Sequence, residues 1–277
     1  MISAAAVSTV SLTYASGGAW SVFNSTNLAT AANLQANWTD IASQLNNNYM
    51  PLLNSAVSEV TALKSASTIT YYANPASGSD TNSGTSAGAA FASIQTAINK
   101  LPQTINHVAT INMATGSYGE TVTISGFNGA GYIQILGGTL VASADSYNIS
   151  NMIINYNSVY VLVVGVKATS ISADGFLVNI NPGRSNFSNV ICSSTAAGYN
   201  AFSTIASPSI DISGSDAANH NCGINAARNA NVCVIGCTGS GNSVGLYSNT
   251  NASIGIQGTY PTGTTTSLAT GGGKITF

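Results

Sequence analysis

Charged residues are scarce in this chain. It has six Lys and Arg and eight Asp and Glu among 277 residues, so 5% of its side chains are charged, against about 25% in an ordinary soluble domain. The formal net charge of −2 leaves no basic surface for phosphates, which excludes nucleic acid as a partner. Because low charge is combined with 44% hydrophobic residues and a mean hydropathy of +0.23, a disordered chain is excluded as well.

Long apolar runs and paired cysteines are also missing. The longest strongly apolar run, 159–166, has eight residues, against roughly 20 for a membrane-spanning helix. Residues 1–12 have no Lys or Arg before a mildly apolar stretch, so we expect no signal peptide and no membrane insertion. The cysteines lack CxxC spacing, which predicts buried free thiols in a reducing compartment and no metal site; they are Cys192, Cys222, Cys233 and Cys237.

Gly, Asn and β-branched residues dominate from residue 68 onward, and they recur with a period of about 22 residues, within the range typical of repeat architectures. Four sets of three positions share this spacing: Phe202, Ile224 and Leu246; Ile210, Val232 and Ile254; Ile212, Val234 and Ile256; Gly214, Gly236 and Gly258. Two of the apolar sets lie two residues apart, as inward-facing positions on one strand must. A period of this length with short strands and Gly or Asn turns predicts a parallel β-helix, in which each coil buries its apolar residues against the next.

Upstream of residue 200 the period is less regular. Ile180 and Val190 lie one period before Phe202 and Ile212, but their neighbours do not match. Strand-like segments nevertheless continue, so about seven coils of roughly 22 residues are expected; these segments are 109–113, 121–124, 132–135 and 159–166. An antiparallel sandwich is the alternative, and it would need Asn-Gly or Asp-Gly turns at hairpin intervals. Such turns occur at 128–129 and 174–175 but not at those intervals, which favours the β-helix.

The region before the β-helix is predicted to be a helical neck over 31–66, preceded by an attachment segment over 1–30. Spacings of three and four residues predict a coiled-coil seam, formed by Leu34, Trp38, Ile41, Leu45, Asn48, Leu52, Val57 and Val60. Asn48 is the kind of polar seam residue that fixes register. Pro51 is expected to interrupt the helix and to start a second one carrying Leu53, Val57, Val60 and Leu63. The alternative is an amphipathic helix pair packed on its own domain.

Three further segments carry a resemblance to a known family. Residues 71–85 read Tyr-Tyr-Ala-Asn-Pro-Ala-Ser-Gly-Ser-Asp-Thr-Asn-Ser-Gly-Thr, which resembles the opening of pectate-lyase-like right-handed β-helix proteins. Residues 91–98 resemble the helix that caps such a solenoid, and 114–124 resemble its first coil, although Ala90 replaces a common Pro. Independently, one apolar face formed by Ile94, Ala97, Ile98 and Leu101 suits a cap on an open core. The expected fold class is therefore all-β, a right-handed single-stranded parallel β-helix over 68–262.

Catalytic clustering is not visible in the sequence. Lyases of this fold bind Ca²⁺ through grouped carboxylates, and glycosidases need two carboxyls around the scissile bond. The acids in the β-helix are Asp80, Glu120, Asp145, Asp174, Asp211 and Asp216. One coil beyond Asp211 lies Cys233, so the column of Asp211 contains no second acid. Asp80 is interpreted as a turn residue, and Glu120 as an outer residue at the start of a strand. We therefore assign no catalytic, cofactor or metal residue; the best enzymatic guess is Asp211, Asp216 and Arg228, with Arg184 another candidate neighbour of Asp211.

The overall layout looks similar to bacteriophage tail spikes and fibres. That resemblance implies a homotrimeric virion protein, made in the host cytoplasm, which docks on another virion protein through its N-terminal segment and binds the host surface. A neutral surface with interspersed tyrosines suits sugars, and the candidates are Tyr147, Tyr156, Tyr160, Tyr199 and Tyr247. His107 and His220 are isolated, and the tail 263–277 could be a terminal strand joining subunits or an attachment point. The alternatives are a polysaccharide-degrading β-helix enzyme and a capsid decoration or head fibre.

Overall fold

The computed structural model describes residues 31–138, 145–193 and 198–277, and the chain divides into two compact units, Met1–Leu63 and Lys64–Phe277. The predicted attachment segment 1–30 lies outside the described residues. In the first unit, helix α1 (Ala31–Gln44) is followed by a π-helical turn η1 (Leu45–Tyr49) and helix α2 (Met50–Ala62). None of the described helices combines the length and apolar character needed to cross a membrane.

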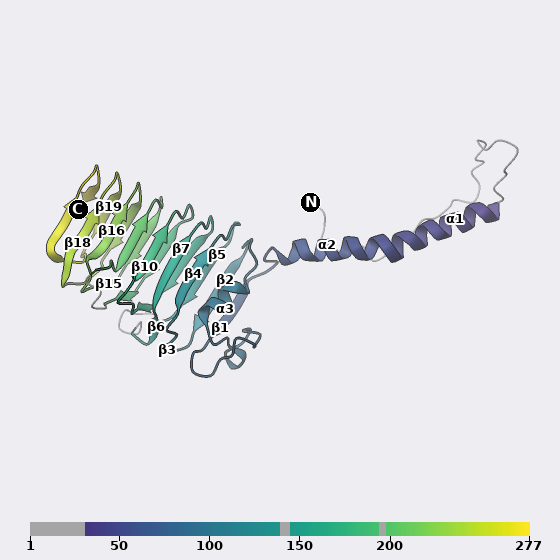
Figure 1. The fold of residues 1–277 in the computed structure, drawn as a ribbon, viewed down its shortest axis with the longest axis horizontal. Helices are drawn as coiled ribbons and strands as arrows, with labels where there is room; N and C mark the ends of the chain where they lie inside the picture. Colours follow the sequence, from purple (N-terminus) through teal and green to yellow (C-terminus); the bar gives the residue numbers. More distant parts are fainter. Residues whose placement is uncertain (1–30, 139–144, 194–197) are drawn as a thin grey trace. The chain divides into compact units, whose positions relative to one another are not determined.

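The second unit is a right-handed parallel β-helix of about seven turns (Figure 1). Its three sheets consist entirely of parallel neighbours among the described strands. The nine-stranded sheet has the order β1 (Ile69–Ala73), β2 (Val108–Met113), β5 (Tyr132–Leu136), β8 (Tyr160–Val164), β11 (Ser185–Ser188), β14 (Ile210–Ser213), β17 (Asn231–Ile235), β19 (Ser253–Gln257) and β21 (Lys274–Thr276). The fold class predicted from the sequence is thus confirmed.

The other two sheets complete each turn. The seven-stranded sheet contains β4 (Thr121–Ser125), β7 (Asn151–Asn155), β10 (Phe176–Asn179), β13 (Phe202–Ile205), β16 (Cys222–Ala227), β18 (Asn242–Ser248) and β20 (Gly263–Ala269). The five-stranded sheet contains β3 (Gly116–Ser117), β6 (Tyr147–Ile149), β9 (Lys167–Ala168), β12 (Ile191–Cys192) and β15 (Asp216–Ala217). A short 3₁₀ turn η2 (Ala87–Ala89) and helix α3 (Ile94–Asn99) lie between β1 and β2 in the sequence.

The columns predicted from the sequence period are register neighbours. Ile210 pairs with Val232 and Val232 with Ile254, while Phe202 pairs with Ile224 and Ile224 with Leu246. All six side chains are buried. The glycine column lies at one corner, where Gly214, Gly236 and Gly258 have φ of 54°, 59° and 82°, a left-handed conformation that glycine adopts without steric cost.

Upstream, the extrapolation of this period is wrong. Phe202 pairs with Phe176, and Ile212 pairs with Phe187, so the partners lie further back in the sequence than one predicted period. Ile180, the expected partner of Phe202, lies instead at a corner with φ of 48° and 47% of its surface exposed. Because the loops between strands are longer in these turns, the spacing that holds later in the chain no longer identifies stacked residues there.

Buried aromatic and amide side chains connect successive turns. The rings of Phe176, Phe187 and Phe202 have centroids 5.1–5.6 Å apart and are 1% exposed. At one corner, fully buried Asn157 accepts the backbone N–H of Phe127 at 3.0 Å, and its own backbone N–H donates to Asn181 Oδ1 at 2.8 Å. These amides satisfy backbone groups where the sheets are interrupted, which buried corners require.

Helix α3 packs against the first strands through the predicted apolar face, since Ile94, Ala97 and Ile98 are at most 2% exposed. The Gln95 side chain donates to Thr123 O at 3.1 Å and accepts from Thr123 N at 2.7 Å. Thr123 lies in β4, which is an edge strand of its sheet. Gln95 therefore satisfies part of an otherwise unpaired edge, which protects it from pairing with another chain.

Two carboxylates hold the start of α3. Glu120 accepts the backbone N–H groups of Ile94 at 2.7 Å and Gln95 at 3.1 Å. Asp80 accepts from the backbone of Ala92 at 3.0 Å and Ser93 at 2.9 Å. Asp80 is thus more than a turn residue, because it and Glu120 both bind amide groups at the amino end of the helix.

The parallel ladder extends past the predicted boundary at residue 262. Strand β20 pairs with β18 and β21 pairs with β19, and Ile275 packs against the core above Ile254. The tail 263–277 therefore forms the last turn of the same solenoid. One column becomes polar in this turn, since Ser267 pairs with Leu246, whereas Ile275 continues another apolar column.

The helical unit differs from the sequence prediction at Pro51. Helical structure continues from residue 31 to residue 62, and Pro51 lies in the first turn of α2. The break expected at Pro51 is replaced by the π-helical turn that directly precedes α2. In a π-turn the backbone N–H groups donate to carbonyl oxygens five residues back, and this turn lies directly before Pro51, which has no N–H to donate.

Replacing Phe202 by alanine should lower the free energy of unfolding of the β-helix by about 3–5 kcal/mol, because it leaves a cavity among stacked rings. Replacing Ile171, which is 68% exposed, should change it by less than about 0.5 kcal/mol. Denaturant unfolding followed by far-UV circular dichroism measures both. Equal effects of the two substitutions would contradict the described core.

The Glu120 carboxyl should make stability depend on pH. Burial raises its pKa above the ordinary value, opposed by hydrogen bonds from Ile94 and Gln95. The folded protein then binds the proton more tightly than the unfolded chain, so this contribution is present at low pH and is lost over the pH range that spans the raised pKa of the folded protein. Compared with Glu120→Gln, the wild type should lose stability over that range. A constant difference in unfolding free energy between the two proteins would refute the assignment.

Candidate functional site

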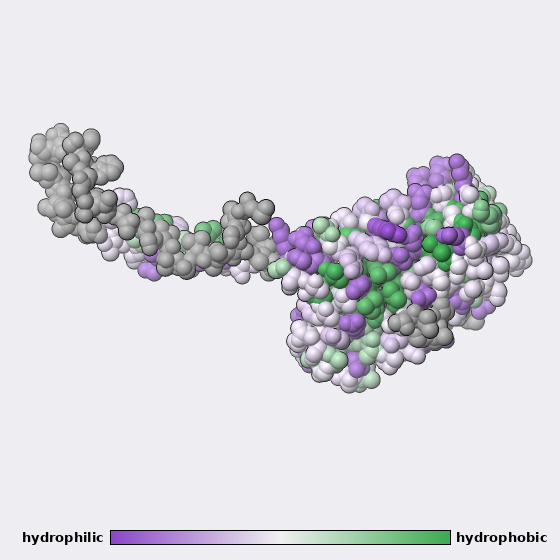
Figure 2. Space-filling view, turned by 180° about the vertical axis from the view of Figure 1, so that it is seen from behind, coloured by the Kyte–Doolittle hydropathy of each residue, from purple (hydrophilic) through white to green (hydrophobic). Residues whose placement is uncertain are grey.

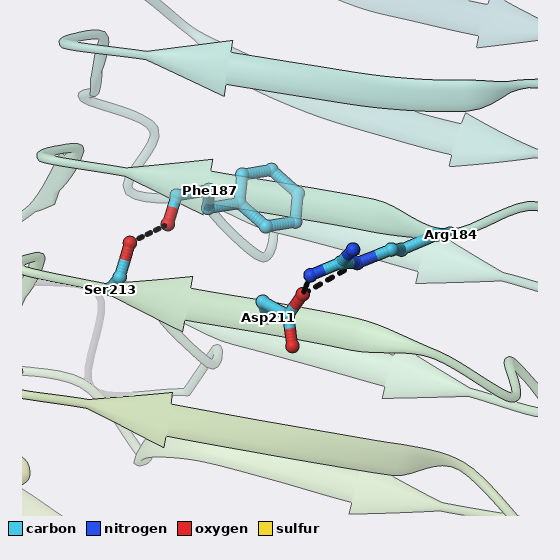
Figure 3. Close-up of polar contacts among 4 residues, drawn as sticks. All are labelled: Arg184, Phe187, Asp211 and Ser213. Carbon is cyan, nitrogen blue, oxygen red and sulfur yellow. Dashed lines mark hydrogen bonds and ion pairs between the residues drawn. The ribbon is translucent and has the colours of Figure 1, made fainter. Parts of the chain in front are cut away.

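An ion pair lies on the outer face of the nine-stranded sheet. Arg184, just before β11, donates from Nε to Asp211 Oδ2 in β14 at 2.7 Å, and a second guanidinium nitrogen contacts the same oxygen (Figure 3). The carboxylate raises the pKa of Arg184. Asp211 thus faces outward as predicted, and its partner is Arg184. Since 56% of the Arg184 side chain is exposed, the pair stabilises the fold by about 1 kcal/mol at most.

Aromatic rings extend this pair along the solenoid. Tyr132 and Tyr160 are register partners with ring centroids 5.9 Å apart, and Arg184 Cζ lies 5.6 Å from the centre of the Tyr160 ring. Burial raises the pKa of Tyr160, and the Arg184 charge opposes this shift. Tyr160 therefore packs between neighbours in adjacent turns.

The structure does not assemble the three residues of the enzymatic guess. Asp211 lies in the nine-stranded sheet, Asp216 lies in β15 of the five-stranded sheet, and Arg228 lies at a corner with φ of 54°. Asp216 accepts a hydrogen bond from Thr238 Oγ1 at 3.2 Å. Within 31–138, 145–193 and 198–277, no three His, Cys, Asp or Glu residues are placed to hold a metal ion.

The other acids of the β-helix have local partners. Asp145 pairs with Lys167 at 2.6 Å, and Asp174 accepts the backbone N–H of Asn200 at 2.8 Å. Asp80 and Glu120 hold the start of α3. Each of these carboxylates therefore contacts a group that the fold itself supplies, whereas glycoside hydrolysis would need two carboxyls facing one substrate.

A buried thiol–imidazole contact was missed by sequence reasoning. Cys192 Sγ lies 3.4 Å from His220 Nε2, and His220 Nδ1 lies 2.6 Å from Ala218 O. Burial raises the pKa of the Cys192 thiol and lowers the pKa of His220. Both groups are at most 1% exposed and stay neutral, which is the opposite of an activated thiolate. The pair is thus part of the core, and His220 is not isolated. His107 contacts Ser65, with Nδ1 3.1 Å from its carbonyl oxygen.

The five tyrosines proposed for sugar binding are dispersed. Tyr147 belongs to the five-stranded sheet, Tyr160 to the nine-stranded sheet and Tyr247 to the seven-stranded sheet. Tyr156 and Tyr199 lie outside the strands and are 55% and 40% exposed. The structure therefore does not bring these residues together into one platform.

A groove beside α3 has neutral polar walls. It has a volume of about 410 Å³ and is lined by Gln95, Ile98, Asn99, Leu101, Gln103, Thr123, Ser125 and Phe127. Its lining contains amides, hydroxyls and apolar groups but no ionisable side chain. Figure 2 shows apolar patches interspersed with polar residues on one face of the solenoid. This chemistry suits hydrogen bonding to a neutral ligand more than charge-driven binding.

The helical unit exposes large apolar side chains. Exposed fractions are 44% for Trp38, 45% for Ile41, 68% for Leu52 and 37% for Val57. Of the remaining predicted seam residues, Asn48 is exposed and Leu45 is half-buried, whereas Leu34 and Val60 lie outside the described side chains. Large apolar side chains exposed along a helix are characteristic of a surface that contacts another protein.

The four thiols should differ in reactivity. Burial raises the pKa of Cys222 to about 11 and also raises the pKa values of Cys192 and Cys237, whereas Cys233 is partly exposed. A thiol-specific reagent at about pH 8 should therefore react quickly with one thiol per native chain. Cys233→Ser should abolish this fast phase. A second fast thiol, or a fast phase that persists in the variant, would contradict the described burial.

Known proteins give no assignment for this chain. No family model matches it, and comparison with curated proteins and with solved structures also finds no match. Function must therefore be inferred from the chain's own chemistry and from its architecture, a parallel β-helix of about seven turns with a separate helical unit before it.

Proposed function

We propose that this protein is a structural subunit of a phage virion, a homotrimeric tail fibre or spike. Its N-terminal segment docks on another virion protein, and its β-helix contributes to binding carbohydrate on the host surface. The observation that carries the proposal is the succession of a helix with an exposed apolar stripe and a β-helix with an almost uncharged surface. An elongated, permanently assembled particle component needs both features, an oligomerisation element and a repetitive rigid shaft.

The positions of the carboxylates favour a structural role over catalysis. Asp80 and Glu120 hold α3, and Asp145 and Asp211 form ion pairs. A glycosidase or lyase would instead need such groups gathered at one cleft. Release of oligosaccharides from host capsule or pectin-like polymers would contradict this part of the proposal and favour the enzyme.

The carbohydrate part of the proposal rests on the groove beside α3. Sugars present hydroxyl groups, and the groove offers the Ser125 hydroxyl, the Asn99 amide N–H groups and the Gln103 amide oxygen. The Asn99 amide oxygen accepts from Gln95, and the Gln103 amide nitrogen donates to Gly126 O. The groove's lack of ionisable groups matches a neutral sugar better than an acidic one. Binding through such groups should be insensitive to salt, since no charge pairs form.

Purified full-length protein should have a native mass of about three times the 27.9 kDa of one chain. Because hydrophobic association and not charge holds the trimer, it should persist at about 1 M salt. Sedimentation equilibrium measures the mass, and a monomer at every concentration would contradict the proposal. Antibody labelling of intact particles then locates the protein, and a label confined to the head would replace the tail assignment by a head fibre.

Replacing Asn99 by alanine should weaken binding to a neutral host glycan by roughly tenfold, the loss expected for one or two hydrogen bonds. Asn99 is exposed, so the substitution should not unfold the domain. Lys274→Ala, on the last strand β21, is the matched surface control and should bind like the wild type. Glycan-array screening followed by calorimetry tests this, and no binding to any host-surface fraction would leave a purely architectural role.

A further inference from the structure

The π-turn η1 adds one residue to the helical unit between α1 and α2. The Met50 N–H donates to Leu45 O, five residues back, whereas an α-helix bonds four residues back. Pro51 follows directly and has no N–H, and in a regular helix its ring would clash with the carbonyl of Asn47. The widened turn therefore removes a conflict that the sequence itself creates.

The extra residue rotates everything after it around the helix axis. One inserted residue corresponds to about 100° in an α-helix. A regular helix would place Asn48 and Leu52 on the face of Trp38, Ile41 and Leu45, as the spacing predicts. Because of the π-turn, Tyr49 and Leu53 occupy these positions on that helix face instead of Asn48 and Leu52.

The rotation joins two apolar stripes that a regular helix would leave out of phase. The first stripe consists of Trp38, Ile41 and Leu45, and the second contains Leu53 and Val57. With the π-turn, successive apolar positions from 38 to 57 are separated by three or four residues: Trp38, Ile41, Leu45, Tyr49, Leu53 and Val57. Tyr49 is 60% exposed and Leu53 51% exposed in the single chain.

We infer that this continuous stripe is the surface through which copies of the chain associate, with Tyr49 and Leu53 in the seam and Asn48 and Leu52 outside it. The inference rests on the proposed homotrimer and specifies how its helices meet. In a parallel assembly each Tyr49 lies at the level of the Tyr49 residues of the other copies, and each Leu53 lies at the level of its equivalents.

The charge pattern supports identical partners. Asp40 and Glu59 are the two charged residues between positions 31 and 62, and Asp40 accepts from Gln44 within its own helix at 2.8 Å. A helix with two acidic groups and no basic group offers nothing to an anionic membrane or to an acidic partner. With so few charges, identical helices can approach closely, and another copy of this chain presents an apolar stripe of the same length with neutral polar flanks.

The adjacent leucines provide a matched test in the full-length chain. Leu53→Asn should raise the concentration at which half of the trimers dissociate by at least about tenfold, because the buried leucine of every copy is lost. Leu52→Asn makes the same chemical change with the same helix propensity and should alter that concentration by less than about threefold. Sedimentation equilibrium measures both, and far-UV circular dichroism checks that both variants keep the β-helix.

Each result separates the inference from the proposed function. If Leu52→Asn dissociates the trimer and Leu53→Asn has little effect, the seam is that of a regular helix. This result would overturn the inference but not the proposed trimer. Equal effects of the two substitutions would also overturn it, because the seam would then have no preferred face. A wild type that is monomeric at all concentrations would instead contradict the homotrimer itself.

Discussion

Stacking of apolar side chains between successive turns is the interaction on which the second unit depends. One turn of the solenoid has no interior of its own, so columns such as Ile210, Val232 and Ile254 become a core only when the turns lie on one another. The same requirement explains the two ends. At the start of the solenoid, helix α3 packs on the first turns and Gln95 binds the edge strand β4; near residue 275, Ile275 continues the column of Ile254.

The sequence predicts this fold well where the turns have equal length. From residue 202 to residue 256, the constant spacing of apolar positions identifies register partners directly, and the glycine column identifies a corner. Before that point loops of different length separate the strands, so Phe176 and not Ile180 stacks on Phe202. Periodicity in a sequence reveals stacking only when every turn has loops of the same length.

Contacts across turns of unequal length could not be predicted. Cys192 and His220 are 28 residues apart in the sequence, which differs from the period of 22, and no motif marks the pair. The neighbours Ile210 and Ile212 place Asp211 on the outer face. The sequence does not indicate, however, that its ion-pair partner is Arg184 and not Arg228. The helical seam shows a different limit, since three-and-four spacing assumes a regular α-helix. The π-turn before Pro51 departs from that regular geometry, and we infer from it that the seam shifts by one residue.

The most direct test of the stacked core is a methyl–methyl NOE experiment on protein with labelled Ile and Val methyl groups. Register partners lie about 4.8 Å apart along the solenoid, and residues two turns apart lie at roughly twice that separation. The structure predicts strong cross-peaks from Val232 to both Ile210 and Ile254, with none between Ile210 and Ile254. A direct cross-peak between those two isoleucines, or the absence of both Val232 contacts, would contradict the stacked turns.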